Sequence, residues 1–396
     1  MDGPILWLLL TTLLGLTLAG VVEAALHRRT LDAIRIRVHV NGTRGKSSVT
    51  RLIAAGLRAG GVRTCAKTTG TLPRWIGPDG AEEPLYRVGP PNVGEQRAVA
   101  RRARKLDADA LVVECMALDP FLQWVSAARL IRPTHGVVTN VRADHLEQMG
   151  PTTRDVARAL AGSVPYGGRL YVTCGAHSDV LFRAARERNT EIVRLDESDA
   201  ARVRPEELAR FGYVEHAENV ALSLAVCADL GVPRATALAA MQRAAPDPGA
   251  LTILPAVVRG QRITFVNGFA ANDPESTERV WELAVERVPR ERRVALFNCR
   301  ADRPERSQQL GRAVARWTRA DSYVVVGSGT HFFVAAAERG GLARGALHVS
   351  EGEHVTHVLS RLADVADSGA LVVGLGNIGG VGLELLQALS DPSSAA

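Results

Sequence analysis

A β-branched segment that leads straight into a glycine-rich loop limits the fold of this chain more than any other part of the sequence. Residues 34–40 (IRIRVHV) alternate in the manner of a strand. The loop 41–48 (NGTRGKSS) follows without a break, and a helical pattern then continues to Gly56. Strand, glycine loop and helix in this order predict an α/β sheet that holds a phosphate group at the loop.

The loop contains the groups that a nucleoside triphosphate requires. Its glycines let backbone N–H groups turn toward an anion, and the helix that follows adds the partial positive charge of its N-terminus. We expect Lys46 to reach the terminal phosphates of ATP and the Ser47 hydroxyl to hold Mg²⁺. Val40 stands where the standard P-loop has glycine. The predicted nucleotide contacts are Gly42, Thr43, Arg44, Gly45, Lys46, Ser47 and Ser48.

Length and composition fit two or three globular domains. The chain has 396 residues, 46% of them hydrophobic, which excludes intrinsic disorder and small disulfide scaffolds. Residues 34–245 alternate short β-branched runs with helical segments, a pattern that predicts parallel βαβ units. The sequence Pro-Asp-Pro-Gly at 246–249 is the expected hinge. A second α/β unit is expected after it, with strands near 262–267, 293–298, 322–327 and 370–375 and helices such as 276–288 and 305–318.

The N-terminal segment predicts one transmembrane helix. Residues 5–22 carry no charged side chain and are numerous enough to span a bilayer core. Asp2 precedes the segment, whereas a cleaved signal peptide normally begins with basic residues; a signal peptide and a buried core helix are the alternatives. The basic side chains that follow it are His27, Arg28, Arg29, Arg35 and Arg37. By the positive-inside rule, they predict a single-pass protein of the cell membrane whose main part is cytoplasmic.

The predicted fold is therefore an α/β architecture in three parts. A transmembrane anchor covers residues 1–30, and a central P-loop-type parallel-sheet ATPase domain covers residues 31–246. A smaller C-terminal α/β domain covers residues 250–396.

Charge and cysteine content narrow the partners only slightly. The net charge of +6 comes almost wholly from arginine, because the lysines are Lys46, Lys67 and Lys105 alone. This balance fits an acidic substrate or simply well-solvated surfaces, and nothing in the sequence indicates nucleic acid. The five cysteines form no CxxC pair, which favours a reducing compartment.

Two polar residues follow predicted strands and are the best candidates for metal ligands. Glu114 ends the apolar strand 110–114 (ALVVE), and His145 follows the strand within 135–144. In a parallel sheet both lie at the carboxyl edge, beside the phosphate loop, and Asp144 is placed to orient the imidazole. The alternatives are a surface ion pair for Glu114 and a structural role for His145. A bound ATP can phosphorylate a carboxylate to an acyl phosphate and so activate it, and Mg²⁺ would neutralise charge on the transferred phosphoryl group.

Several segments together resemble a known enzyme superfamily. Residues 42–48 resemble the GTxGKTT loop of the Mur ligases and folylpolyglutamate synthetases, which are ATP-dependent amide-forming enzymes. Further likeness lies at 112–114, 137–150, 215–227, 265–277 and 298–304, so the resemblance covers about residues 34–310. Within this superfamily, the segments 39–61, 66–74 and 269–277 most resemble the ligase subunits of membrane-bound poly-γ-glutamate synthases.

The resemblance implies further site residues and partners. It makes Lys67, Thr68, Arg74 and Arg142 candidate substrate contacts, and Thr69 a further candidate metal ligand; as bare chemistry, the loop 66–74 is also compatible with a simple capped turn. It implies nucleotide contacts from Asn267, Asp302 and Arg303 in the C-terminal part. The implied substrates are glutamate and a growing poly-γ-glutamate chain, and the implied partners are small membrane subunits of the same synthase.

The chain departs from the superfamily pattern in places. Mur-type ligases typically use a carbamylated lysine downstream of the DHL element, yet this chain has no lysine after Lys105. Gly268 and Ala270 replace an aspartate and a lysine of the asparagine-led loop. The segment 23–41 leaves no room for the nucleotide-sugar domain of cell-wall ligases, which favours an amino acid or an acidic chain as substrate.

The sequence thus predicts a membrane-anchored ATP-dependent ligase that adds glutamate to the terminal carboxylate of an acidic chain. Two other functions fit part of the same pattern. A membrane-tethered P-loop ATPase that drives transport or assembly would hydrolyse ATP without any amino acid. A scaffolding subunit with a degenerate site would lack ATP binding.

Overall fold

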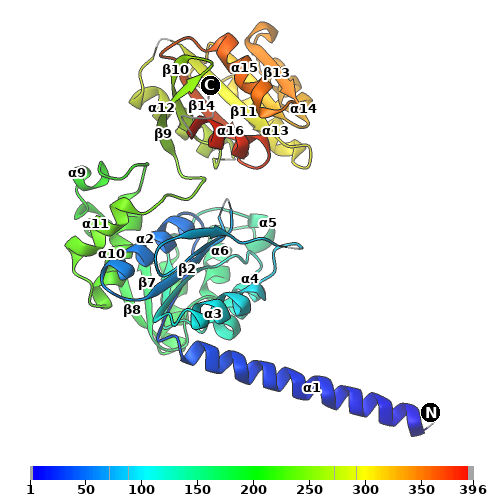
Figure 1. The fold of residues 1–396 in the computed structure, drawn as a ribbon, viewed down its shortest axis with the longest axis vertical. Helices are drawn as coiled ribbons and strands as arrows, with labels where there is room; N and C mark the ends of the chain where they lie inside the picture. Colours follow the sequence, from blue (N-terminus) through cyan, green and yellow to red (C-terminus); the bar gives the residue numbers. More distant parts are fainter. Residues whose placement is uncertain (1–2, 71, 88, 272, 291, 391–396) are drawn as a thin grey trace. The chain divides into compact units, whose positions relative to one another are not determined.

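The computed structural model describes residues 3–390 apart from 71, 88, 272 and 291, and it divides into two compact units (Figure 1). Unit 1 comprises residues 1–211 and 215–245, and unit 2 comprises residues 212–214 and 246–396. Each unit is built around one β-sheet with helices on its faces. The predicted α/β class is therefore confirmed.

Unit 1 contains an eight-stranded sheet in the order β4-β3-β2-β5-β1-β6-β7-β8. The neighbouring strands β2, β5, β1, β6, β7 and β8 pair in parallel. Strands β3 and β4 are antiparallel additions at one edge, which the sequence pattern did not predict. The strands are β1 Ile36–Asn41, β2 Thr64–Thr68, β3 Arg74–Ile76, β4 Glu82–Pro84, β5 Ala110–Glu114, β6 His135–Val138, β7 Arg169–Thr173 and β8 Glu191–Leu195.

Helices cover both faces of this sheet. Alpha helices α2, α10 and α11 pack on one side, and α3, α4 and the π-helix η1 lie on the other (Figure 1). The helices of the globular part are α2 Lys46–Ala59, α3 Glu95–Lys105, α4 Pro120–Val125, η1 Ser126–Ile131, α5 Leu146–Met149, α6 Thr153–Ala161, α7 Ser178–Glu187, α8 Glu197–Ala201, α9 Pro205–Leu208, α10 Ala217–Asp229 and α11 Arg234–Arg243.

The strand order places the glycine loop at a switch point of the sheet. Strand β1 lies between β5 and β6. The strands that follow β1 in the chain, β2 and β5, lie on one side of it, and β6 lies on its other side. Crevices at such points, beyond the carboxyl ends of the strands, are where open α/β sheets bind ligands. The loop after β1 and the ends of β5 and β6 therefore meet at one edge.

Helix α1 (Gly3–Asp32) projects from unit 1 and has 30 residues (Figure 1). Among the described residues, α1 is the one helix that is long and apolar enough to cross a membrane, through its segment from Ile5 onward. None of the most apolar part of this segment is buried. Exposure of this kind does not fit a buried core helix, because burial is what stabilises apolar side chains in a soluble domain.

Unit 2 contains a six-stranded sheet in the order β13-β12-β11-β14-β10-β9. It is parallel except for β9, which pairs antiparallel with β10. The elements are β9 Thr252–Val258, β10 Gln261–Asn267, α12 Pro274–Arg287, β11 Arg293–Cys299, α13 Pro304–Val314, β12 Ser322–Gly327, α14 Thr330–Arg339, the 3₁₀-helix η2 Arg344–Ala346, β13 Leu347–Glu351, α15 Val355–Val365, β14 Leu371–Gly376 and α16 Val381–Ser390. The strands expected near 262–267, 293–298, 322–327 and 370–375 all form.

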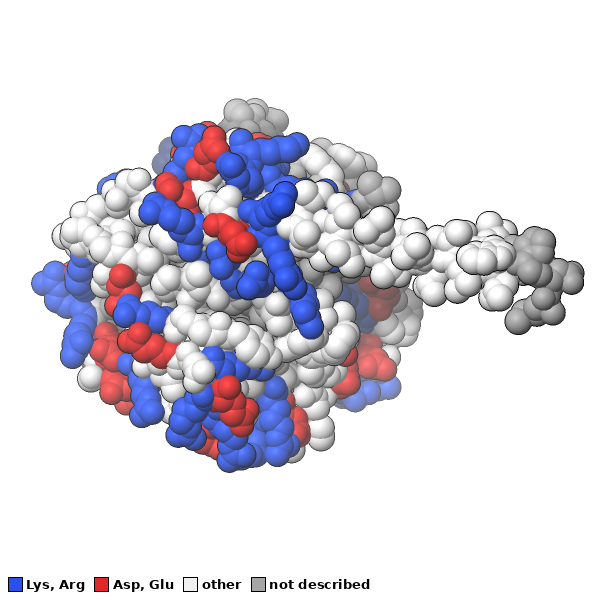
Figure 2. Space-filling view, turned by 90° about the horizontal axis from the view of Figure 1, so that it is seen from below, with Lys and Arg blue, Asp and Glu red and all other residues white. Residues whose placement is uncertain are grey.

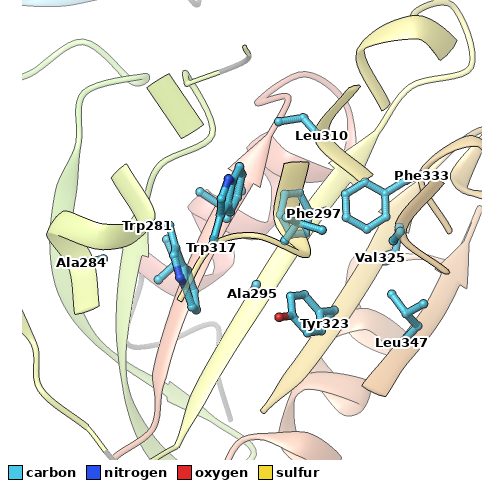
Figure 3. Close-up of a cluster of buried hydrophobic side chains, with 14 of the residues drawn as sticks. Trp281, Ala284, Ala295, Phe297, Leu310, Trp317, Tyr323, Val325, Phe333 and Leu347 are labelled. Carbon is cyan, nitrogen blue, oxygen red and sulfur yellow. The ribbon is translucent and has the colours of Figure 1, made fainter. Parts of the chain in front are cut away.

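Aromatic side chains fill one face of the unit 2 sheet (Figure 3). The rings of Phe297 and Phe333 lie 4.5 Å apart between centroids, and Phe297 also contacts Trp317. The indole N–H of Trp281 donates to the Thr318 carbonyl at 2.8 Å, so this buried polar group is satisfied. Aliphatic strand residues continue the same core.

Candidate active site

The glycine loop between β1 and α2 is shaped by two residues in the left-handed region. Gly42 has φ 129° and Gly45 has φ 83°, conformations that other residues adopt only with strain. Gly45 directly precedes the first residue of α2. The loop therefore ends at the N-terminus of a 14-residue helix, where free N–H groups and the helix dipole favour an anion.

The end of β6 clamps this loop by hydrogen bonds to its backbone and side chains. The Asn140 side-chain oxygen accepts from the Thr43 hydroxyl at 2.5 Å and from the Arg44 N–H at 3.1 Å. The Thr139 hydroxyl donates to the Arg44 carbonyl at 2.6 Å. Arg142 adds a bond from its own N–H to the Thr43 hydroxyl at 3.1 Å, while its side chain is exposed. These bonds hold the loop in one shape before a ligand arrives.

Lys46 is held within the loop that it follows. Its ammonium donates to the carbonyls of Gly42 at 2.8 Å and of Thr43 at 3.1 Å. The charged group therefore lies inside the curve of the glycine loop, where a phosphate would contact the same backbone. The contact of Lys46 with the terminal phosphates stays a prediction.

We expect Gly45→Ala to disrupt this loop and Gly61→Ala to serve as its matched control. Both glycines have φ near 80°, so alanine strains either backbone by about 1 kcal/mol. Only at position 45 would the new methyl carbon lie 2.7 Å from the Asn219 side-chain oxygen, because nothing lies within 4 Å at Gly61. Thermal unfolding and equilibrium ATP binding would test this difference. Equal losses in both variants would contradict it.

Glu114 lies next to the loop, at the buried end of β5. One of its carboxylate oxygens accepts from the Ser47 hydroxyl at 2.9 Å and from the Thr69 backbone N–H at 2.6 Å. Glu114 is almost fully buried, and a buried carboxylate requires such donors. Three of the residues expected at the metal site are therefore brought together, although Thr69 contributes its backbone N–H in this contact.

His145 lies in a more open position. It precedes α5 with φ 46°, and its side chain is 43% exposed. Its imidazole nitrogens lie 3.7 Å from Asp144 and 3.5 Å from Glu147, so the expected hydrogen bond from the imidazole N–H to Asp144 is not formed. Asp144 instead pairs with Arg44 of the loop at 3.6 Å. Within the described part of the chain, no group of three or more His, Cys, Asp or Glu side chains forms a ready metal site.

Of the four residues expected to contact substrate, two are buried and two are at least partly exposed. Lys67 is fully buried, where its ammonium lies 2.5 Å from Glu95, and burial lowers its pKa. In this arrangement it contacts Glu95 rather than open space. Thr68 is also buried, and its hydroxyl has no hydrogen-bond partner. Arg74 is half-buried at the start of β3, and only Arg142 exposes its side chain beside the loop.

A buried histidine lies beneath the loop on β1. His39 is 1% exposed, its Nε2 lies 3.2 Å from the Ser126 hydroxyl, and its Nδ1 has no partner. Burial lowers the pKa of His39 to about 4, and the nearby Lys67 ammonium acts in the same direction. The folded protein therefore keeps this imidazole neutral across the physiological range.

This histidine predicts a loss of stability in mild acid. Below pH 6.5 the unfolded chain binds a proton at His39 that the folded chain does not, down to pH about 4. The free energy of unfolding should therefore fall by about 1.4 kcal/mol per pH unit across this window. Denaturant unfolding at several pH values should show a smaller fall for His39→Gln, whereas the exposed His331→Gln should behave as the parent. An unchanged slope in His39→Gln would refute the prediction.

A cavity of about 820 Å³ adjoins the loop on the side of β6 and β7. Arg44 and Gly45 line one end of it, and the start of α10 lines another part. Its remaining lining includes the ends of β6 and β7 and the start of α8, at residues 139–142, 173–176 and 196–197. This volume is in the range of small-molecule sites. No sequence motif marks the β7 and α8 residues of this lining, so they could not be predicted.

Glu215 joins the start of α10 to the start of α2. Its carboxylate accepts from the Ser48 hydroxyl, from the His216 N–H at 2.8 Å and from the Asn219 side chain at 2.8 Å. Asn219 also lies against Gly45. Segment 215–227, which sequence analysis noted for its resemblance alone, is therefore part of the wall around the loop.

The expected C-terminal contacts all lie in unit 2. Asn267 ends β10, is buried, and donates to the carbonyls of Pro248 and Ala250, each at 3.1 Å. Asp302 accepts two bonds from Arg300, at 2.9 and 2.8 Å, which lower its pKa. Arg303 precedes α13.

Comparisons with known proteins assign both units. Residues 40–218 match the Mur ligase middle domain, and residues 253–391 match the poly-gamma-glutamate synthase CapB C-terminal domain. The PGA synthase CapB of Bacillus subtilis (strain 168) is 36% identical over 389 residues, which cover 98% of each chain.

Solved structures share the fold at low identity. E. coli FolC in complex with DHPP and ADP has a TM-score of 0.63 and 16% identity, covering 92% of each chain. Mycobacterium tuberculosis folylpolyglutamate synthase complexed with ADP and AMPPCP has a TM-score of 0.65 and 16% identity, covering 94% of this chain and 96% of that one.

The phosphate loop at a sheet switch point, the buried glutamate beside it and the matching domain models define an ATP-dependent amide ligase of the Mur type. Identity along nearly the whole chain narrows this class further. The chain belongs to the CapB family of poly-γ-glutamate synthases.

Proposed function

We propose that this enzyme adds glutamate to the terminal carboxylate of a growing poly-γ-glutamate chain. The observation that carries the proposal is the contact between Ser47 and Glu114 at the phosphate loop, in a chain whose relative is named a PGA synthase. The substrate class is inferred from the family. The glycine loop and Glu114 together form a site where ATP and the substrate carboxylate can bind side by side.

The proposed reaction has two steps. A carboxylate oxygen of the acceptor attacks the γ-phosphorus of ATP, the bond to the β-phosphate oxygen breaks, and ADP leaves. The glutamate amine then attacks the carbonyl carbon of the acyl phosphate, so that a C–N bond forms and phosphate and a proton are released. Backbone N–H groups of the loop and the Lys46 ammonium hold the phosphates and stabilise the charge that develops on them.

The residues at the end of β5 fit a magnesium ion. Mg²⁺ binds through one or two protein oxygens together with phosphate oxygens and water, and Ser47 and Glu114 offer a hydroxyl and a carboxylate next to the loop. The Thr68 hydroxyl, one position before Thr69 in the chain, is buried without a partner. His145 and Thr69 complete the proposed ligand set. When bound, the ion supplies charge neutralisation on the transferred phosphoryl group.

The remaining nucleotide and substrate contacts are assigned by position. We assign the nucleoside to the cavity beside Arg44 and Gly45, because it opens directly from the phosphate loop. Asn267, Asp302 and Arg303 are proposed as further nucleotide contacts from unit 2. Arg74 and Arg142 are proposed to hold substrate carboxylates, since guanidinium groups bind them bidentately.

We further propose that α1 anchors the enzyme in the cell membrane with both units in the cytoplasm. The length and hydropathy of α1 support the anchor, and the basic residues after position 22 support the orientation. Small membrane subunits of the synthase are the proposed partners of this helix.

Dependence of ATP turnover on both organic substrates tests the proposed reaction. Membranes that contain the enzyme should release ADP only when glutamate and a γ-glutamyl acceptor are both present, and labelled glutamate should enter polymer. ADP release that does not depend on either compound would indicate a tethered ATPase instead and would refute the ligase assignment.

A further inference from the structure

Helix α1 does not end at the membrane but continues into unit 1 as one rigid element. It runs unbroken from Gly3 to Asp32, and Leu31 near its end is completely buried in the core beside α3. His27 lies 2.8 Å from the Leu130 carbonyl of η1 through its Nε2. Because of these contacts, no flexible linker lies between the described apolar segment and unit 1. The direction of α1 therefore determines which face of unit 1 meets the bilayer.

One ion pair shows which part of unit 1 lies beside the end of the apolar segment. Glu23 is the first charged residue after the uncharged stretch 5–22, and its carboxylate lies 2.6 Å from Arg97 in the first turn of α3. The first turn of α3 is therefore at the height of the lipid headgroups if residues 5–22 fill the hydrocarbon core. Figure 1 shows α1 leaving unit 1 on the side that carries α3 and α4.

This side of unit 1 exposes large aromatic and apolar side chains. Phe121 and Leu122 on α4 are 65% and 39% exposed, and Tyr166 is 62% exposed. The Trp124 indole N–H donates to the Tyr166 hydroxyl at 3.2 Å, and the Trp124 ring lies 5.8 Å from that of Phe121. Exposed apolar groups in a cluster mark an interaction surface, and Trp and Tyr are the residues that favour the bilayer interface.

Basic side chains are exposed on α1, α3 and η1. Arg28 and Arg29 are exposed on the last turns of α1, and Arg101 is exposed one turn beyond Arg97 on α3. Arg129 of η1 is exposed and lies over the Trp124 ring at 5.3 Å. Figure 2 shows that the projecting part of α1 itself carries no charge. The arrangement combines an apolar patch with guanidinium groups, which suits anionic headgroups better than a neutral partner.

We propose that unit 1 lies on the membrane through the face formed by α3, α4 and η1, with Phe121, Leu122 and Trp124 at the headgroup level and Arg101 and Arg129 bound to anionic phospholipids. We call this surface the lipid-facing surface. The inference rests on the proposed anchoring by α1 and goes beyond it, because an anchor alone leaves the orientation of the catalytic unit open. It implies that the growing product is made close to the bilayer.

A fluorescent probe at two positions tests the contact with lipid. Of the five cysteines only Cys174 is exposed, so Cys174→Ser removes the background label. The full chain with Leu122→Cys, labelled with a nitrobenzoxadiazole dye, is placed in vesicles of phosphatidylcholine and phosphatidylglycerol that carry nitroxide-labelled headgroups. The matched control is Thr236→Cys, an exposed site on α11 at the opposite face of the sheet. The probe at 122 should lose most of its emission, and the probe at 236 should keep it.

The outcomes separate the two proposals. A chain that does not float with vesicles would refute both the anchor and the lipid-facing surface. A chain that floats, with equal emission at 122 and 236, would refute the surface alone. Quenching at 122 should also weaken in pure phosphatidylcholine and in the double variant Arg101→Glu/Arg129→Glu, and unchanged quenching would refute the role of anionic lipid. ATP-dependent glutamate incorporation by both labelled chains in detergent should equal that of the unlabelled Cys174→Ser chain, which tests the ligase reaction separately.

Discussion

Lys46→Ala should reduce ATP-dependent glutamate incorporation by about 10²–10³-fold, the loss typical of removing one preorganised donor to a developing negative charge. The ammonium already lies inside the loop, within hydrogen-bond distance of the Gly42 and Thr43 carbonyls. Its removal takes away a positive charge at the place where the transferred phosphate is expected. Initial rates of polymer formation in membranes are the measurement.

The small number of lysines provides a clean comparison for this variant. Lys105, at the end of α3, is exposed and has no role in the proposed site, so Lys105→Ala should retain the full rate. ATP binding to Lys46→Ala should also weaken in equilibrium dialysis with Mg²⁺. Parent-like rates and binding in Lys46→Ala would mean that the glycine loop is not the nucleotide site.

Glu114→Gln should lower the rate by at least about 10²-fold, because it removes a negative charge that contacts Ser47 while keeping the shape of the side chain. The amide oxygen can still accept the bond from the Thr69 N–H, so the fold should survive. A higher concentration of Mg²⁺ should be needed for half-maximal activity, a change that a purely structural role would not produce.

The control for this variant is an acid of the same type on the surface. Glu187 at the end of α7 is exposed, and Glu187→Gln should leave both the rate and the Mg²⁺ requirement unchanged. Polymer yield from Glu114→Gln equal to that of the parent would remove Glu114 from the proposed metal site.

The parts of the fold that follow from local pattern were predictable. The strand, glycine loop and helix at 34–56 are contiguous, so their chemistry and their geometry come from one stretch of sequence. Glu114 could be placed because a buried apolar strand that ends in an acid sets that acid at the carboxyl edge of a parallel sheet. Strands β10, β11, β12 and β14 of unit 2 were equally clear, since each is a short apolar run rich in β-branched residues.

Features that depend on distant partners were not predictable. The antiparallel strands β3, β4 and β9 are edge additions whose pairing is determined by their neighbours. The burial of Lys67, which the sequence predicts as a substrate contact, depends on the carboxylate of Glu95 on another element. The hydrogen bonds from Thr139 and Asn140 likewise join the glycine loop to residues that lie 95 to 97 positions later in the sequence.

The short segment 212–214 changes how the two units are connected. Because this segment belongs to unit 2 while the residues on either side belong to unit 1, the chain passes between the units after residues 211, 214 and 245. The Val214 N–H donates to the Leu251 carbonyl at 3.0 Å, which fixes the segment within unit 2. A single proteolytic cut after residue 245 would therefore leave the segment 212–214 on the fragment that carries unit 1, so the unit 2 released in this way would lack one of its own segments.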